Sequence, residues 1–170
     1  LVGTPAREAV GLPADASSEP IAVVRPGGPE DVVTILKVGR SRHFDVVVRS
    51  RLPAIDADNL RNVIVLDASG LDKTPAVDIG RRVVTAGAGV PAAIIDRAAR
   101  GARLCLRSAL AFDDGASIGA LLSVGEPGEL GSGAGSLAAD VVAATVVTGN
   151  GRIARLGGPL LIGQTPWAAS

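Results

Sequence analysis

The spacing of apolar positions changes several times along the chain, and each change predicts a new element. A short apolar run at 21–24, bounded by prolines, predicts a strand. From Pro29 the apolar residues recur at helical spacing up to about residue 42, and the acidic pair behind this proline is typical of a helix start. The β-branched run at 45–49 predicts a buried strand. These three elements form a β-α-β unit, whose two strands we expect to be parallel.

The rest of the chain alternates short strand-like runs with helical and glycine-rich stretches. The predicted elements are strands over 62–67, 76–78, 82–87, 104–106, 141–148 and 152–156, and a helix over 90–101 that ends with Gly101 as its cap. The strands at 76–78 and 82–87 read as a hairpin. Asn150-Gly151, between the last two strands, is a strong hairpin signal.

Composition narrows the class of protein. Of 170 residues, 47% are hydrophobic and 20% are charged, which excludes a disordered chain and predicts a soluble globular α/β domain. Basic and acidic residues balance at 17 each, so there is no electrostatic case for a nucleic acid or a membrane as partner. Residues 1–18 lack the features of a signal peptide, and we expect a cytoplasmic protein.

Few side chains are available for catalysis by the protein itself. There is no tyrosine, His43 is the single histidine, and no G-x-S-x-G motif occurs, so a serine-type triad has little support. A single cysteine, Cys105, predicts neither a disulfide framework nor a metal site, and we expect it to be a small buried core residue. We expect His43 to cap the helix before it. Glycine is dense over 113–135, which indicates either backbone close to a ligand or simply long loops.

Five segments share their order and spacing with a known family. They are 22–33 (AVVRPGGPEDVV), 46–49 (VVVR), 63–71 followed by 82–90, 116–125 (ASIGALLSVG) and 139–151 (ADVVAATVVTGNG). Together, over about 20–167, they resemble the PCMH-type FAD-binding domain of the FAD-linked oxidase (vanillyl-alcohol-oxidase) superfamily. Glycines in such loops let backbone N–H groups approach a pyrophosphate closely.

The resemblance implies an α+β fold of two subdomains with FAD extended between them, bound without a covalent link. The expected divisions are an N-terminal extension at 1–18, a small β-α-β subdomain at 19–70, a larger, mainly antiparallel subdomain at 71–165 and a tail at 166–170. The pyrophosphate of FAD would lie at Ser50–Ala54 and Asp113–Ala120. The cofactor-binding residues it implies are Arg49, Ser50, Arg51, Leu52, Pro53, Ala54, Asp114, Ser117, Ile118, Gly119, Ala120 and Gly125.

Several positions depart from the family pattern. Where the family has R-G-G-G-H/T, this chain has Arg49 followed by SRLPA, with no glycine and with Pro53 lacking an N–H donor. The histidine that some members link to the flavin has no counterpart, Ala120 replaces a paired glycine, and Ala139 replaces an arginine. Together these changes predict weakened, altered or lost FAD binding.

The leading function is therefore a FAD-binding domain or subunit of an FAD-linked oxidoreductase. Such proteins pass a hydride from a small alcohol or hydroxy acid to the flavin. We expect no cap domain within this chain, so the groups that contact the substrate would come from a partner chain or a longer form of this one, and no catalytic residue is assigned. The alternative is a flavin-free remnant that binds a small molecule, as a non-redox cyclase-like catalyst or a regulatory protein. A scaffold subunit is a third possibility.

Overall fold

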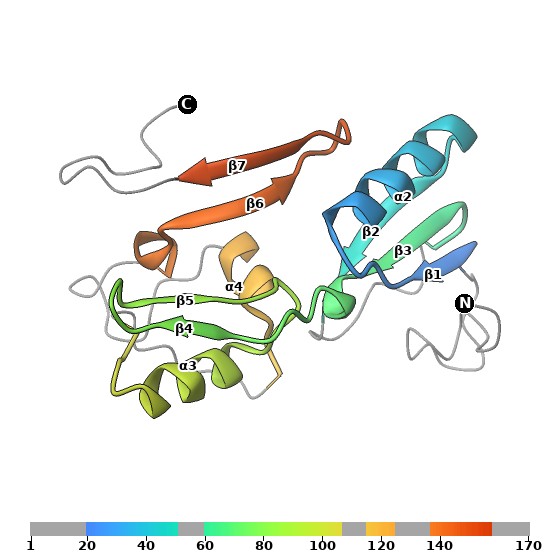
Figure 1. Ribbon diagram of the computed structural model, residues 1–170. Helices are drawn as coiled ribbons and strands as arrows, with labels where there is room; N and C mark the ends of the chain where they lie inside the picture. The colour runs from blue at the N-terminus through green and yellow to red at the C-terminus, as the bar shows by residue number, and fades with distance from the viewer. Residues whose placement is uncertain (1–19, 51–59, 107–114, 125–136, 158–170) are drawn as a thin grey trace.

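The computed structural model describes residues 20–50, 60–106, 115–124 and 137–157 (Figure 1). The strands are β1 (Ala22–Val24), β2 (Asp45–Arg49), β3 (Val63–Asp67), β4 (Ala76–Asp78), β5 (Val83–Thr85), β6 (Ala143–Val147) and β7 (Ile153–Gly157). The α-helices are α2 (Pro29–Arg42), α3 (Ala92–Gly101) and α4 (Ile118–Val124), and two 3-10 turns are η2 (Ala68–Gly70) and η4 (Leu137–Asp140).

The first lobe is a parallel sheet in the order β1-β3-β2. The predicted β-α-β unit is confirmed, and β3 lies between its two strands, pairing with both in parallel. Residues 63–66 of this central strand are all buried, because both faces of a central parallel strand are covered. This explains why β3 is a continuous apolar run in the sequence rather than an alternating one.

Helix α2 covers one face of this sheet (Figure 1). Ile35 packs there against Ile64 and Leu66, whereas Val63 and Val65 form a second cluster on the other face with Leu60. The helix ends at Arg42 and is followed by His43, a left-handed residue with φ of 58° whose backbone N–H donates to carbonyl oxygens of the last turn. The expectation that His43 caps this helix is confirmed, and the cap is made by its backbone.

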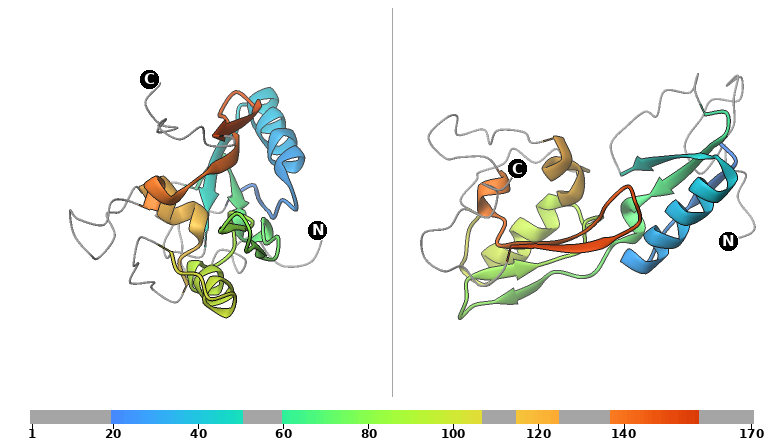
Figure 2. Two further views of the ribbon diagram at one scale, coloured as in Figure 1. Left: turned by 60° about the vertical axis from the view of Figure 1, so that its left-hand side comes forward. Right: turned by 90° about the horizontal axis from the view of Figure 1, so that it is seen from above.

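The second lobe contains the antiparallel pairs β4–β5 and β6–β7 together with α3 and α4. Both predicted hairpins are confirmed, and the mixture of a small parallel sheet with antiparallel pairs confirms the α+β class. In the two further views, the β6–β7 hairpin extends from η4 toward α2 of the first lobe (Figure 2). Among the described residues, no helix combines the length and apolar character needed to cross a membrane.

Three expectations around the end of α3 are wrong. Gly101 is the last helical residue rather than the cap, and Ala102 takes the cap position. Residues 104–106 form no strand, because the N–H of Leu104 is used by the carbonyl oxygen of Ala99 at the end of the helix. Cys105 is exposed rather than buried, since it lies on this irregular segment.

Candidate functional site

The carboxyl ends of the three parallel strands meet at one edge of the sheet. Arg25 follows β1, Arg49 ends β2, and Asp67 ends β3 opposite Arg49 in the strand register. Ligands of sheets with parallel strands bind at this edge. The edge therefore is the place to look for a site, and it includes the first two of the predicted cofactor-binding residues, Arg49 and Ser50.

Asp67 fixes the chain as it leaves β3. Its carboxylate accepts hydrogen bonds from Nη2 of Arg25 at 3.0 Å and from the backbone N–H of Ser69 at 3.1 Å. Burial of this carboxyl group raises its pKa, but hydrogen bonds from the hydroxyl and backbone N–H of Ser69 and from Arg25 lower it by more. The net pKa of Asp67 lies below its ordinary value, so the side chain is a charged cap that holds η2 in place.

From η2 to α4 the chain is held by close contacts between backbones. Gly89 lies against η2, where a Cβ would come within 2.2 Å of the carbonyl oxygen of Ala68, and its N–H donates to the carbonyl of Leu71 at 2.8 Å. Gly119 lies against Ala88 in the same way, with a Cβ distance of 2.9 Å to its carbonyl oxygen. The end of β3 is thus connected to the start of α4 through contacts that leave no room for side chains.

The two predicted cofactor loops meet at a pair of serine hydroxyls. Ser50 Oγ and Ser117 Oγ are hydrogen-bonded to each other, although the residues are 67 positions apart. Ser117 is 1% exposed, and its hydroxyl also accepts a hydrogen bond from the N–H of Ala120 at 3.3 Å. The structure therefore brings the end of β2 and the start of α4 into contact.

The N–H groups at the start of α4 all have protein partners. Those of Ile118 and Gly119 donate to the carbonyl oxygens of Val90 and Ala88, each at 2.9 Å. Those of Ala120 and Leu121 both donate to Ser117, to its hydroxyl and its carbonyl oxygen respectively. A phosphate at this turn would have to exchange with one of these bonds, and the weakest by distance is that of Ala120.

The predicted site residues divide into two groups. Arg49, Ser50, Ile118, Gly119 and Ala120 are half-buried around Ser117, and the structure gathers these six at the carboxyl edge. The other predicted residues, Arg51, Leu52, Pro53, Ala54, Asp114 and Gly125, lie outside the described part of the chain. The assignment of all twelve residues to the cofactor remains a prediction.

The sequence motifs give no role to Arg25, Asp67 or Ser69. The available signal was the position of Asp67 directly after a buried apolar strand, where a carboxylate often caps the following turn. Its partner Arg25 follows β1, and only the parallel register of β1 with β3 places the two side chains together.

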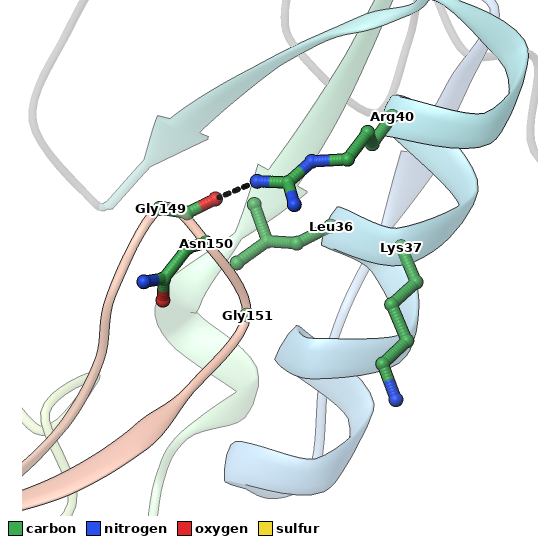
Figure 3. A pocket seen from close by; sticks show the side chains of 6 residues that line it. All are labelled: Leu36, Lys37, Arg40, Gly149, Asn150 and Gly151. Atoms are coloured by element: carbon green, nitrogen blue, oxygen red, sulfur yellow. Dashed lines mark hydrogen bonds between the residues drawn. The ribbon is translucent and has the colours of Figure 1, made fainter.

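A small pocket lies elsewhere, between α2 and the β6–β7 turn (Figure 3). Leu36 and Arg40 point from the helix toward residues 149–151, and Nη2 of Arg40 donates to the carbonyl oxygen of Gly149 at 3.3 Å. The pocket has a volume of about 20 Å³, enough for water but not for a nucleotide. It lies against the C-terminal half of α2, and a helix that crosses between parallel strands runs back toward their amino ends. The pocket is thus separate from the carboxyl edge that holds Ser50.

Comparisons with known proteins agree with this architecture. The structure is similar to 6-hydroxy-D-nicotine oxidase from Arthrobacter nicotinovorans, with a TM-score of 0.69 and 17% identity over 92% of this chain and 34% of that one. It is also similar to a variant of Phl p 4, a glucose dehydrogenase, with a TM-score of 0.62 and 18% identity over 78% of this chain and 28% of that one. The chain spans about a third of the length of these two proteins.

A comparison with curated protein sequences finds no significant match. The family described as FAD binding domain, however, matches residues 20–157, which include both lobes and every described site residue. The chain therefore belongs to the FAD binding domain family, the PCMH-type domain that its motifs resemble.

Proposed function

We propose that this chain is the FAD-binding part of an FAD-linked oxidoreductase that oxidises a small alcohol or hydroxy acid. FAD is the cofactor of the family to which the chain belongs. The bound flavin would supply the hydride acceptor. The residues of this chain would bind and orient it, and another chain, or the remainder of a longer one, would contribute the groups that contact the substrate.

The observation that carries this proposal is the hydrogen bond between Ser50 and Ser117. The motifs assign these two residues to different cofactor loops, and a shared ligand requires those loops to lie together. They do so at the carboxyl edge of a parallel sheet, which is the usual place for a nucleotide in such folds.

The chemistry of this edge fits a phosphate group. Ser50 and Ser117 offer hydroxyl groups, and Arg49 contributes a positive charge at the end of β2. Gly119 and Ala120 carry almost no side chain, so the backbone at the start of α4 can be approached closely. The described carboxylate nearby, Asp67, is paired with Arg25, which reduces its repulsion of an anion.

The described residues provide no obvious proton acceptor for a substrate at this edge. His43 is exposed at the end of α2, and the carboxylate at this edge, Asp67, is engaged in capping η2. A base is needed to take the hydroxyl proton when an alcohol loses a hydride. This supports the assignment of substrate chemistry to another chain or another part of a longer protein.

A second candidate is a flavin-free member of the family that binds another small molecule. The observation that favours it is the full engagement of the N–H groups at the start of α4 with protein oxygen atoms. The two candidates differ in one measurable property, the affinity for FAD.

The test is a titration of the purified protein with FAD, followed by absorbance and flavin fluorescence and by gel filtration. We expect a flavin band that stays with the protein, and weaker binding by Arg49→Ala. Arg97→Ala removes an exposed arginine of α3 and is the matched control, with unchanged affinity. A protein that stays colourless at high FAD concentration would contradict the proposal and favour the second candidate.

A further inference from the structure

Ser50 stands where the family motif has the first of its glycines, directly after Arg49. A serine keeps its backbone farther from a bound phosphate than a glycine does, but it adds a hydroxyl group that can donate a hydrogen bond. The structure places this hydroxyl just after β2, where Ser50 is half-buried and hydrogen-bonded to Ser117. What Ser50 can offer a ligand therefore depends on which of the two hydroxyls donates to the other.

The burial of Ser117 decides the direction of this hydrogen bond. A serine hydroxyl has one proton to donate and two lone pairs. Ser117 is 1% exposed, so its proton cannot go to bulk water, and a buried donor without an acceptor is costly. Within the part of the chain that the structure describes, its hydroxyl has two partners, Ser50 Oγ and the N–H of Ala120, and only the first can accept. Ser117 therefore donates to Ser50.

This direction leaves the proton of Ser50 for a ligand. The N–H of Ala120 donates to Ser117 at 3.3 Å, and Ser117 donates to Ser50, so the two bonds run in the same direction and end at Ser50. Among the described residues, none accepts the proton that Ser50 itself holds, and its half-buried position keeps this proton accessible. A hydroxyl that already accepts a hydrogen bond is a stronger donor, because successive bonds polarise one another.

We infer that Ser50 is the side-chain donor that this chain offers to a phosphate oxygen of FAD in place of the glycine of the family, and that Ser117 is a positioning residue that orients the proton of Ser50. The inference rests on the proposed function. An ionised phosphate oxygen only accepts hydrogen bonds, so it matches the available proton of Ser50 and leaves the bond from Ser117 intact. The two serines therefore stay hydrogen-bonded when the cofactor binds.

The experiment compares FAD titrations of the wild type with Ser50→Ala, Ser117→Ala and the double variant, after thermal unfolding has checked that each is folded. We expect Ser50→Ala to weaken FAD binding roughly tenfold or more, the range for one hydrogen bond to a charged group. Ser117→Ala leaves Ser50 its proton and should weaken binding less, by roughly two- to fivefold. The double variant should bind FAD like Ser50→Ala, because Ser117 acts through Ser50.

Two further variants are controls. Ser50→Thr keeps a hydroxyl on the same carbon atom and should restore most of the wild-type affinity. Ser123→Ala removes a hydroxyl of α4 that donates to the carbonyl oxygen of Gly119 at 2.8 Å, and it should leave the affinity unchanged. A purely structural link between β2 and α4 would be broken equally by Ser50→Ala and Ser117→Ala, so equal losses of affinity would refute the inference.

NMR of the hydroxyl protons provides a readout that needs no flavin. A buried proton that is hydrogen-bonded within the protein exchanges slowly with water, whereas an accessible one exchanges fast. We expect a slowly exchanging hydroxyl proton on Ser117 in the flavin-free protein and none on Ser50. A slowly exchanging proton on Ser50 would reverse the direction of the bond and overturn the inference.

The outcomes separate this inference from the proposed function. If the wild type binds FAD and Ser50→Ala binds it equally well, the proposed function stands and the role of Ser50 is refuted. The same holds if Ser117→Ala weakens binding by the same factor with and without the Ser50 hydroxyl, because Ser117 would then contribute on its own. If the wild type does not bind FAD, the proposed function fails, and the assignment of Ser50 to its phosphate fails with it.

Discussion

The parallel sheet and the segment from η2 to α4 are held together in different ways. In the sheet, Ile64, Val65 and Leu66 are at most 5% exposed and pack through their side chains. Between η2 and α4, Gly89 and Gly119 bring backbone against backbone, with hydrogen bonds of 2.8 and 2.9 Å. The sheet should therefore be sensitive to loss of volume, whereas the candidate site should be sensitive to added volume.

Leu66→Ala should have the largest effect, because it breaks the side-chain packing of the sheet. Leu66 is 2% exposed and lies between β1 and β2, under α2. Truncation leaves a cavity among Ile35 and Ile64, and we expect a loss of about 3 kcal/mol in the free energy of unfolding. Denaturant unfolding followed by circular dichroism measures this change.

The matched control is Val48→Ala, on the neighbouring strand β2. Val48 is paired with Leu66 in the register but is 65% exposed, so its truncation should change stability by less than about 0.5 kcal/mol. Equal losses for the two variants would contradict the assignment of the core to β3.

Gly89→Ala tests the second region, because it adds one carbon atom to the segment from η2 to α4, which packs through its backbone. The new Cβ would lie 2.2 Å from the carbonyl oxygen of Ala68 and 3.0 Å from Cα of Ser69, so η2 must shift. We expect a loss of about 2 kcal/mol in the free energy of unfolding. FAD affinity should also fall, since η2 leads through Gly89 and Ala88 to the start of α4.

Gly101→Ala is the control for a glycine without such neighbours. Nothing lies within 4 Å of the position of its Cβ, and it is the last residue of α3. Alanine favours a helix, so this variant should raise the free energy of unfolding by about 0.5 kcal/mol. A similar destabilisation of both variants would refute the role of the close contact at Gly89.

The same contrast explains how much of the fold could be predicted from the sequence. The sheet was predictable because side-chain burial leaves a periodic signal: the bounds of β2 and the apolar run of β3 follow directly from it. The end of α3 was not, because it depends on single backbone hydrogen bonds, such as Leu104 to Ala99, which leave no pattern. For the same reason Cys105 was expected in the core and lies exposed.

The candidate site was predictable as two separate loops but not as an arrangement. The motifs pointed to Ser50 and Ser117, and only the fold shows that their hydroxyls meet. The Asp67–Arg25 pair depends on the register between β1 and β3, whose paired residues are 42 positions apart in sequence, and the pattern of apolar residues does not contain this register. Contacts of this kind come from tertiary structure, whereas the identities of loop residues come from the sequence.

Asp67 lies where the parallel sheet joins the segment from η2 to α4, and its contribution to stability depends on pH. Its folded-state pKa is lowered, so its contribution to stability is present above the unfolded-state pKa and is lost as the pH falls through the folded-state value. We expect Asp67→Asn, which keeps the shape but loses the charge facing Arg25, to be less stable by about 1 kcal/mol at pH 7.

This difference should begin to shrink as the pH falls below about 4, the ordinary range of an aspartate, because the unfolded wild-type chain is protonated there first. It should vanish below the lowered folded-state pKa of Asp67, where the folded carboxyl group is neutral as well. Unfolding free energies of both proteins at a series of pH values between neutrality and the acid limit test this. If the two curves run parallel down to the lowest pH, the charge of Asp67 does not stabilise η2. If they converge, the stability of η2 depends on the carboxylate of Asp67 at the end of β3. Acid should then loosen the segment from η2 to α4, which forms the candidate site, before it unfolds the parallel sheet.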